Sequence, residues 1–91
     1  MVVHLAASSS GTNAPSVGFV VSKAVGNAVV RNRVKRRMRA IVAHHLPEIP
    51  EGLLVVVRAL PEAGSADYAR LEGDLESCLR RALVRYGQET S

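Results

Sequence analysis

The sequence predicts an α+β two-layer sandwich in which two helices pack on a mixed sheet of three strands. Three short stretches rich in Val and Leu and two longer stretches with apolar residues at three- and four-residue spacing follow one another in the order strand, strand, helix, strand, helix. The strand–helix–strand unit needs a crossover connection, so its two strands are expected to be parallel and to flank a basic helix. The 91 residues are expected to form one domain over 1–91.

The three strands are predicted from their β-branched and apolar residues. The first is expected over Val2–Ala7, before a loop at 8–16 that is rich in Ser, Gly, Asn and Pro. The second, over Val17–Lys23, is expected to pair antiparallel with the first across this loop and to be buried on much of both faces. The third, Leu53–Ala59, is a continuous apolar run apart from Arg58 and is therefore predicted to be the central strand.

The two helices are predicted from apolar periodicity and from capping residues. The first is expected over 28–45, with Asn27 as its N-cap and two prolines shortly after its end. The second is expected to begin after Ser65, which can cap it, and to end near Tyr86 before Gly87, with a frayed tail after it. The expected buried stripes are Val30, Val34, Met38, Ile41 and Val42 in the first helix, and Tyr68, Leu71, Leu75, Cys78, Leu79, Ala82, Leu83 and Tyr86 in the second.

Positive charge is concentrated in the first half of the chain. Residues 1–47 carry seven Lys and Arg and no Asp or Glu (+7), and residues 48–91 carry five and eight (−3), which together give the net charge of +4. The seven residues are Lys23, Arg31, Arg33, Lys35, Arg36, Arg37 and Arg39. Six of them lie within nine residues without a compensating acid, and such a cluster favours an anionic partner over the alternative of a solvated helix face.

The basic helix is predicted to present this charge away from its apolar stripe. At 100° per residue, the side opposite the stripe holds Asn32, Lys35, Arg36 and Arg39, and the flanks of the stripe hold Arg31, Arg33 and Arg37. The Asn32 amide can both donate and accept, so it could read a base edge or a sugar hydroxyl, while guanidinium groups suit paired phosphate oxygens. The chain has no helix–turn–helix spacing and no dimerising heptads, so RNA is expected as the partner and DNA is not.

Residues suited to catalysis or metal binding are few. His4, His44 and His45 show no spacing to Cys, Asp or Glu that suits a metal site, and the two consecutive histidines are interpreted as surface residues at a helix end. Cys78 is interpreted as a small buried apolar residue, and a single cysteine suits a reducing cytoplasmic location. No apolar run reaches the ~18–20 residues of a membrane span. We therefore expect no catalytic residue, no protein-bound metal and no membrane partner.

The stretch from Gly18 to Arg39, GFVVSKAVGNAVVRNRVKRRMR, resembles the strand and the "RNR" helix of the protein subunit of bacterial ribonuclease P. Residues that match this pattern are Ala28, Arg31, Asn32, Arg33, Val34, Lys35, Arg36, Met38 and Arg39. The later segment Leu53–Pro61 and the amphipathic last helix also match, so the resemblance covers nearly the whole chain. It implies a role in an endoribonuclease that removes the 5′ leader from precursor tRNA, in which the RNA subunit performs the Mg²⁺-dependent cleavage and the protein assists binding.

The resemblance also implies particular sites. Contacts to ribonuclease P RNA are expected from the basic helix through Arg31, Arg33, Lys35, Arg36 and Arg39, with Lys23 and Arg37 as further RNA-binding candidates. Arg31 and Asn32 are expected nearest the precursor tRNA leader. The leader is expected in a cleft on the sheet, lined by Leu5, Phe19 and Val21.

The chain departs from the family pattern at its start and in its aromatic content. Family members usually begin with a basic helix and a short strand that wall the leader cleft, and this chain is expected to be N-terminally shortened relative to them. Leu5 stands where an aromatic residue is common in the family, so the chain has few aromatic side chains on which RNA bases could stack. Because fold alone does not settle function, a non-catalytic RNA-binding or ribosome-associated protein of similar fold remains the alternative.

Overall fold

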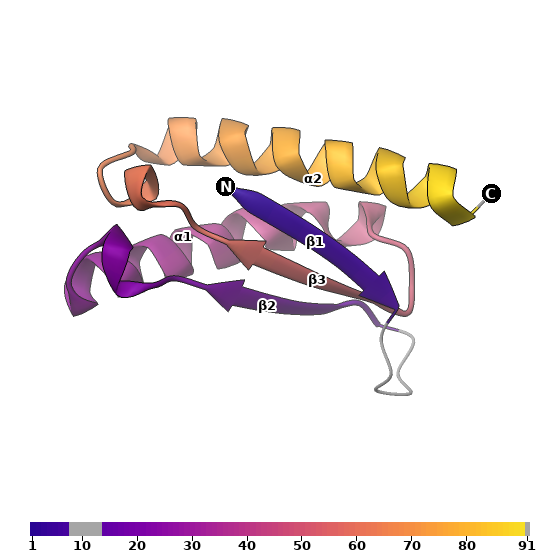
Figure 1. The fold of residues 1–91 in the computed structure, drawn as a ribbon, viewed down its shortest axis with the longest axis horizontal. Helices are drawn as coiled ribbons and strands as arrows, with labels where there is room; N and C mark the ends of the chain where they lie inside the picture. Colours follow the sequence, from indigo (N-terminus) through magenta and orange to yellow (C-terminus); the bar gives the residue numbers. More distant parts are fainter. Residues whose placement is uncertain (8–13, 91) are drawn as a thin grey trace.

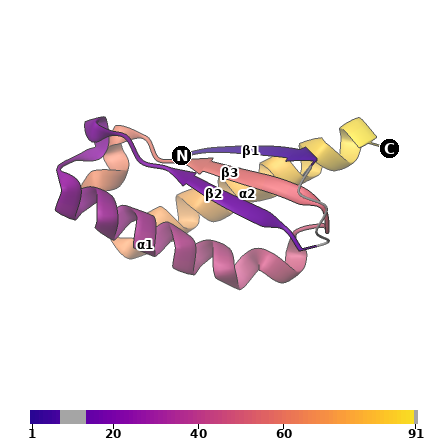
Figure 2. The same ribbon diagram turned by 90° about the horizontal axis from the view of Figure 1, so that it is seen from below.

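The computed structural model describes residues 1–7 and 14–90 and has two layers, a three-stranded sheet and two long helices (Figure 1). The elements are β1 (Val2–Ala7), β2 (Ser16–Val20), η1 (Lys23–Val25), α1 (Ala28–His45), η2 (Leu46–Glu48), β3 (Leu53–Arg58), η3 (Pro61–Gly64) and α2 (Tyr68–Thr90), where η marks a short 3-10 helix. Figure 2 shows that both helices lie on the same side of the sheet. The predicted α+β two-layer class is confirmed; the predicted loop at 8–16 lies mostly outside the described residues.

The sheet has the order β1-β3-β2, with β3 in the centre as predicted. β2 runs parallel to β3, which confirms the parallel pair around the basic helix. β1 pairs antiparallel with β3, so the expected pairing of the first two strands is wrong. The physical reason is that β3 is the most apolar strand, and the central position buries it between two neighbours. β2 is also shorter than expected, because the chain leaves the sheet after Val20 and forms η1.

The pleat gives the sheet one buried face and one open face. On the helix side, Leu53, Val55 and Val57 of β3 are at most 1% exposed. No helix of the described chain lies on the opposite side, and we call it the uncovered face (Figure 2). By alternation and register, the uncovered face consists of Val2, His4 and Ala6 of β1, Leu54, Val56 and Arg58 of β3, and Ser16, Gly18 and Val20 of β2.

The first helix forms as predicted. It spans Ala28–His45, and the side chain of Asn27 accepts a hydrogen bond from the Val30 amide at 3.0 Å, which makes Asn27 its N-cap. The stripe is buried against the sheet and α2, with Val34, Met38, Ile41 and Val42 at most 2% exposed. Val30, at the first turn, is partly buried against this core.

The second helix differs from the prediction at both ends. The Asp67 carboxylate accepts a hydrogen bond from the Arg70 amide at 2.8 Å and so caps α2, whereas the Ser65 hydroxyl donates to the Glu62 carbonyl. Tyr68, expected in the buried stripe, is 38% exposed at the helix start. The helix continues through Gly87 to Thr90, because a glycine inside a helix costs only about 1 kcal/mol and stops nothing by itself.

A close backbone approach fixes the start of α1 against the start of α2. A Cβ atom at Gly64 would collide with the Val25 carbonyl oxygen, so only glycine lets η3 pack this closely on η1. Gly26 has φ 156°, and a Cβ there would lie 2.7 Å from Val30 Cγ1. These contacts place the N-terminal end of α1 beside the 64–66 turn.

Candidate RNA interface

The polar surface of α1 divides into two flanks with different neighbours. The strand-facing flank, next to β2, consists of Arg31, Asn32, Lys35 and Arg39. The turn-facing flank, next to the 64–66 turn, consists of Arg33 and Arg37. Arg36 is exposed between the two flanks. Among the described residues, no Lys or Arg of α1 forms an ion pair with an acidic side chain, so the charge of the helix is not neutralised within the part that the structure describes.

The first turns of the strand-facing flank surround a hollow beside the end of β2. Arg31, Asn32 and Lys35 line it together with Val21 and Ala28. The Nε atom of Arg31 is buried and has no hydrogen-bond partner among the described residues. Since an unpaired buried donor is costly, the Arg31 guanidinium is held where a bound acceptor would satisfy it. This hollow is therefore suited to an anionic or polar group of a ligand.

Arg39 lines a second hollow two turns further along the same flank. Val17 and Phe19 of β2 and Leu46 after α1 form its apolar part. Arg31, Lys35 and Arg39 follow each other at four-residue spacing, so their positions are separated by about 6 Å along the helix axis. That spacing is close to the separation of successive phosphates in a nucleic-acid strand.

The turn-facing flank is engaged within the protein. Arg33 Nη2 donates to the Gly64 carbonyl at 3.1 Å, and Arg37 Nη1 donates to the Ala66 carbonyl at 3.5 Å. Both side chains are part-buried, and Arg33 Nε has no hydrogen-bond partner within residues 1–7 and 14–90. The sequence assigned both arginines to RNA. The structure shows that they connect α1 to the chain that leads into α2, because their helix positions face this turn, and their contacts to RNA stay a prediction.

Lys23 and the capped start of α1 add positive charge at the N-terminal end of the helix. Lys23 is exposed in η1, three residues before Gly26. No acidic residue occurs in the first turn of α1. The unpaired amides of a helix N-terminus carry partial positive charge, which adds to that of Lys23 and Arg31.

The structure does not bring the three predicted cleft residues into one cleft. Leu5 pairs with Val55 and Phe19 with Val57, so both point to the helix side, and each borders a different hollow. Val21 lies beyond the end of β2 and borders the hollow of Arg31. The side of the sheet follows from parity, because a strand places alternate residues on opposite faces, and a role of these residues in leader binding stays a prediction.

Sequence reasoning missed the residues of the uncovered face. Val20 is 46% exposed there, and a Cβ atom at Gly18 would meet nothing within 4 Å. Arg58 is exposed on this face between its register partners Val2 and Val20. The sequence did contain one signal for this face, which is Arg58 at the end of an otherwise apolar strand.

His45 links the end of α1 to α2. Its Nδ1 lies 3.2 Å from Glu48 Oε2 and its Nε2 lies 3.1 Å from Glu76 Oε1. Burial lowers the pKa of His45, but the hydrogen bonds and negative charges of the two glutamates outweigh burial and raise the pKa above its ordinary 6.5. The expected surface histidine is thus a bridge between the helices. Cys78, expected to be buried, is only partly so.

Two further sequence expectations concern metals and membranes. In residues 1–7 and 14–90, no three His, Cys, Asp or Glu side chains gather closely enough to hold a metal ion. No helix in these ranges has the length and apolarity that crossing a membrane requires.

The fold and the site define a class: a small α+β protein that presents a cationic helix surface of the kind that binds nucleic acid. A family model described as Ribonuclease P matches residues 1–83. The chain belongs to the ribonuclease P protein family, as the RNR resemblance predicted. It is accordingly a component of ribonuclease P, an endoribonuclease.

Curated proteins and solved structures agree with this family. The chain is 53% identical over 90 residues to the ribonuclease P protein component of Streptomyces bikiniensis, covering 91% of this chain and 73% of that protein. The structure superposes on the ribonuclease P protein of Staphylococcus aureus with a TM-score of 0.72 at 28% identity, covering 88% of this chain and 72% of the other. For the Thermotoga maritima protein the TM-score is 0.72 at 26% identity, with coverages of 87% and 74%.

Proposed function

We propose that this protein binds the catalytic RNA of ribonuclease P through the strand-facing flank of α1 and thereby assists removal of the 5′ leader from precursor tRNA. The observation that carries the proposal is the alignment of Arg31, Lys35 and Arg39, which form no ion pair within the described chain. Exposed Arg36 adds to this charge, and exposed Lys23 lies before the helix start. Phosphate contacts of this kind position RNA without reading its sequence.

In this proposal the protein contributes binding, and the RNA subunit carries the hydrolytic chemistry with Mg²⁺ that the RNA holds. The positive charge of the strand-facing flank reduces repulsion between the catalytic RNA and the precursor tRNA, so that less Mg²⁺ is needed for their association. Asn32, exposed between Arg31 and Lys35, can donate to and accept from a base edge or a 2′-hydroxyl. The cytoplasm remains the predicted location.

The precursor tRNA leader is proposed to lie on the uncovered face of the sheet. Leu5 and Phe19 face the helices, so a strand of RNA on the sheet would meet Val20, Arg58 and His4 instead. The hollow of Arg31 and Asn32 lies beside the end of β2, next to this face. A leader leaving the cleavage site near Arg31 would thus reach the sheet directly.

Reconstitution with the cognate RNA tests the proposal. The protein should restore cleavage of precursor tRNA at a low Mg²⁺ concentration at which the RNA alone is inactive. A variant with Lys35→Glu and Arg39→Glu should lose this effect, while a variant with Arg70→Glu and Arg80→Glu, exposed positions of α2, should keep it. No restoration by the unmodified protein at any Mg²⁺ concentration, together with binding to ribosomal RNA, would favour a ribosome-associated protein instead.

A further inference from the structure

The charge of α2 is divided along its length. Residues 48–76 contain seven Asp and Glu and two Arg, whereas residues 77–88 contain Arg80, Arg81 and Arg85 and no acidic residue. The negative net charge of residues 48–91 therefore comes entirely from residues 48–76. The stretch of α2 from Arg80 to Arg85 forms a second cationic region, separate in sequence from α1, and one acidic residue, Glu89, follows it near the end of the helix.

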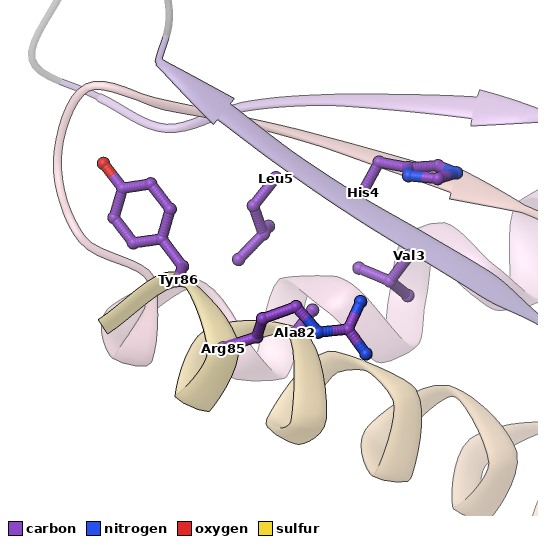
Figure 3. Close-up of a pocket in the computed structure, with 6 residues that line it drawn as sticks. All are labelled: Val3, His4, Leu5, Ala82, Arg85 and Tyr86. Atoms are coloured by element: carbon purple, nitrogen blue, oxygen red, sulfur yellow. The ribbon is translucent and has the colours of Figure 1, made fainter. Parts of the chain in front are cut away.

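Two of these arginines lie beside the free edge of the sheet. Arg81 and Arg85 line adjoining hollows between α2 and β1, with Val3 and Ala82 common to both hollows. Figure 3 shows the Arg85 side chain extending from α2 alongside β1, with Tyr86 next to Leu5. Arg81 is oriented by weak contacts, from Nε to the Ser77 carbonyl at 3.4 Å and from Nη2 to Cys78 Sγ at 3.4 Å. Among the described residues neither arginine forms an ion pair.

The two cationic regions border opposite edges of the uncovered face. The strand-facing flank lies along β2, and the groove of Arg81 and Arg85 lies along β1, with β3 between them. Neighbouring strands are ~4.8 Å apart, so the edges are separated by about 10 Å, a span of a few nucleotides. Arg58 sits between the edges, paired in register with Val2 of β1 and Val20 of β2. Positive charge therefore continues from one edge of the sheet to the other.

We propose that Arg81 and Arg85 form a distal binding site for the phosphates of the precursor tRNA leader after it has crossed the uncovered face. This inference rests on the proposed function, which places the leader on that face. Two guanidinium groups one helical turn apart can each bind a phosphate oxygen pair. The groove contacts neither α1 nor its hollows, so it can recognise only the far part of the leader.

Precursor tRNAs with leaders of different length test the site. The holoenzyme would be assembled from the full chain and the cognate RNA, and its affinity for substrates with leaders of about two and about ten nucleotides would be measured. A variant with Arg81→Gln and Arg85→Gln should bind the long-leader substrate about three- to tenfold more weakly and the short-leader substrate equally well. For the long leader, the slope of log K against log salt should fall by about 1 to 2.

The matched control is Arg70→Gln with Arg80→Gln, which removes the same charge from α2 away from the groove. This control should bind both substrates as the unmodified protein does. Equal weakening for both leader lengths would overturn the inference, because it would place the two arginines against the catalytic RNA or the tRNA body. Unchanged affinity of the Arg81/Arg85 variant would also overturn it. Failure of the proposed function would show differently, as an unmodified protein that has no effect on cleavage.

Discussion

The two flanks of α1 carry the same residue types but have different surroundings. On the strand-facing flank, Lys35 and Arg39 point into open hollows and have no acidic partner in the described chain. On the turn-facing flank, Arg33 and Arg37 donate to carbonyls of the 64–66 turn. The difference teaches that charge count does not define an RNA-binding face: a basic residue on such a helix can act in folding, in binding, or in both.

The largest expected effect comes from charge reversal on the strand-facing flank. Lys35→Glu with Arg39→Glu should weaken binding to ribonuclease P RNA about a hundredfold, since two phosphate contacts become repulsive. The melting temperature should stay within a few degrees, because both side chains are exposed. Filter binding and thermal circular dichroism measure the two quantities. A variant that fails to fold would break the comparison, because it would give this flank a structural role.

Substitution of Gly64, whose carbonyl accepts the hydrogen bond from Arg33, should cause the largest loss of stability. Gly64→Ala forces a Cβ atom against the Val25 carbonyl, which should lower the free energy of unfolding by about 2 kcal/mol. For a domain of this size, that corresponds to a fall in melting temperature of ~8–16 °C. Gly73→Ala is a matched control, because a Cβ at that position meets nothing within 4 Å. Equal melting temperatures for the two variants would contradict this prediction, because they would show that the 64–66 turn can shift to accommodate the Cβ atom without loss of stability.

Removing the Arg33 guanidinium, which donates to this turn, should reduce stability less than adding a Cβ atom at Gly64. Arg33→Gln loses the hydrogen bond to the Gly64 carbonyl, and we expect a cost of about 1 kcal/mol in unfolding free energy, since the side chain is only part-buried. RNA affinity measured below the melting transition should fall less than in the Lys35/Arg39 variant. A larger loss of affinity than of stability would mean that Arg33 also contacts RNA, and the two flanks would then differ less than the structure indicates.

The smallest expected effect concerns pH and the far end of α1. His45 has a raised pKa in the folded protein, so its bridge to Glu48 and Glu76 contributes stability that is fully present below pH 6.5 and is lost as the pH rises through the folded-state pKa. The melting temperature of the unmodified protein should therefore fall between pH 6 and pH 8 more than that of His45→Gln. If the melting temperatures of the two proteins changed equally with pH, the stabilising interaction of His45 with Glu48 and Glu76 would be contradicted. RNA binding at a fixed pH should hardly change, since His45 lies off the strand-facing flank.

The sequence predicted what depends on local periodicity. The limits of α1, its Asn27 cap and its buried stripe all follow from residues within a few turns of each other. The division between the flanks did not follow, because it depends on carbonyls about 30 residues away in the chain. Ser65 was the wrong prediction for the cap of α2, which is Asp67, because either side chain can accept from an amide and the sequence does not say which one does.

The sheet shows a second kind of limit. Alternation along β1 and β2 predicts two faces, but only the position of the helices says which face is buried, and it places Leu5 and Phe19 on the helix side. The central position of β3 was predicted, but the partner of β1 was missed for a similar reason. Adjacency in sequence favoured pairing β1 with β2, while burial of the apolar β3 in the centre decided the order.

The insertion of β3 between β1 and β2 also constrains the order of assembly. Val3 of β1 pairs with Val57, more than fifty residues later in the chain, whereas β2, α1 and β3 are contiguous. During synthesis β1 has no partner until β3 has emerged, and closing so long a loop is entropically slower than forming the local unit. The strand at the amino end is therefore the last to join the sheet. Its amides should exchange with solvent deuterium earlier than those of β3.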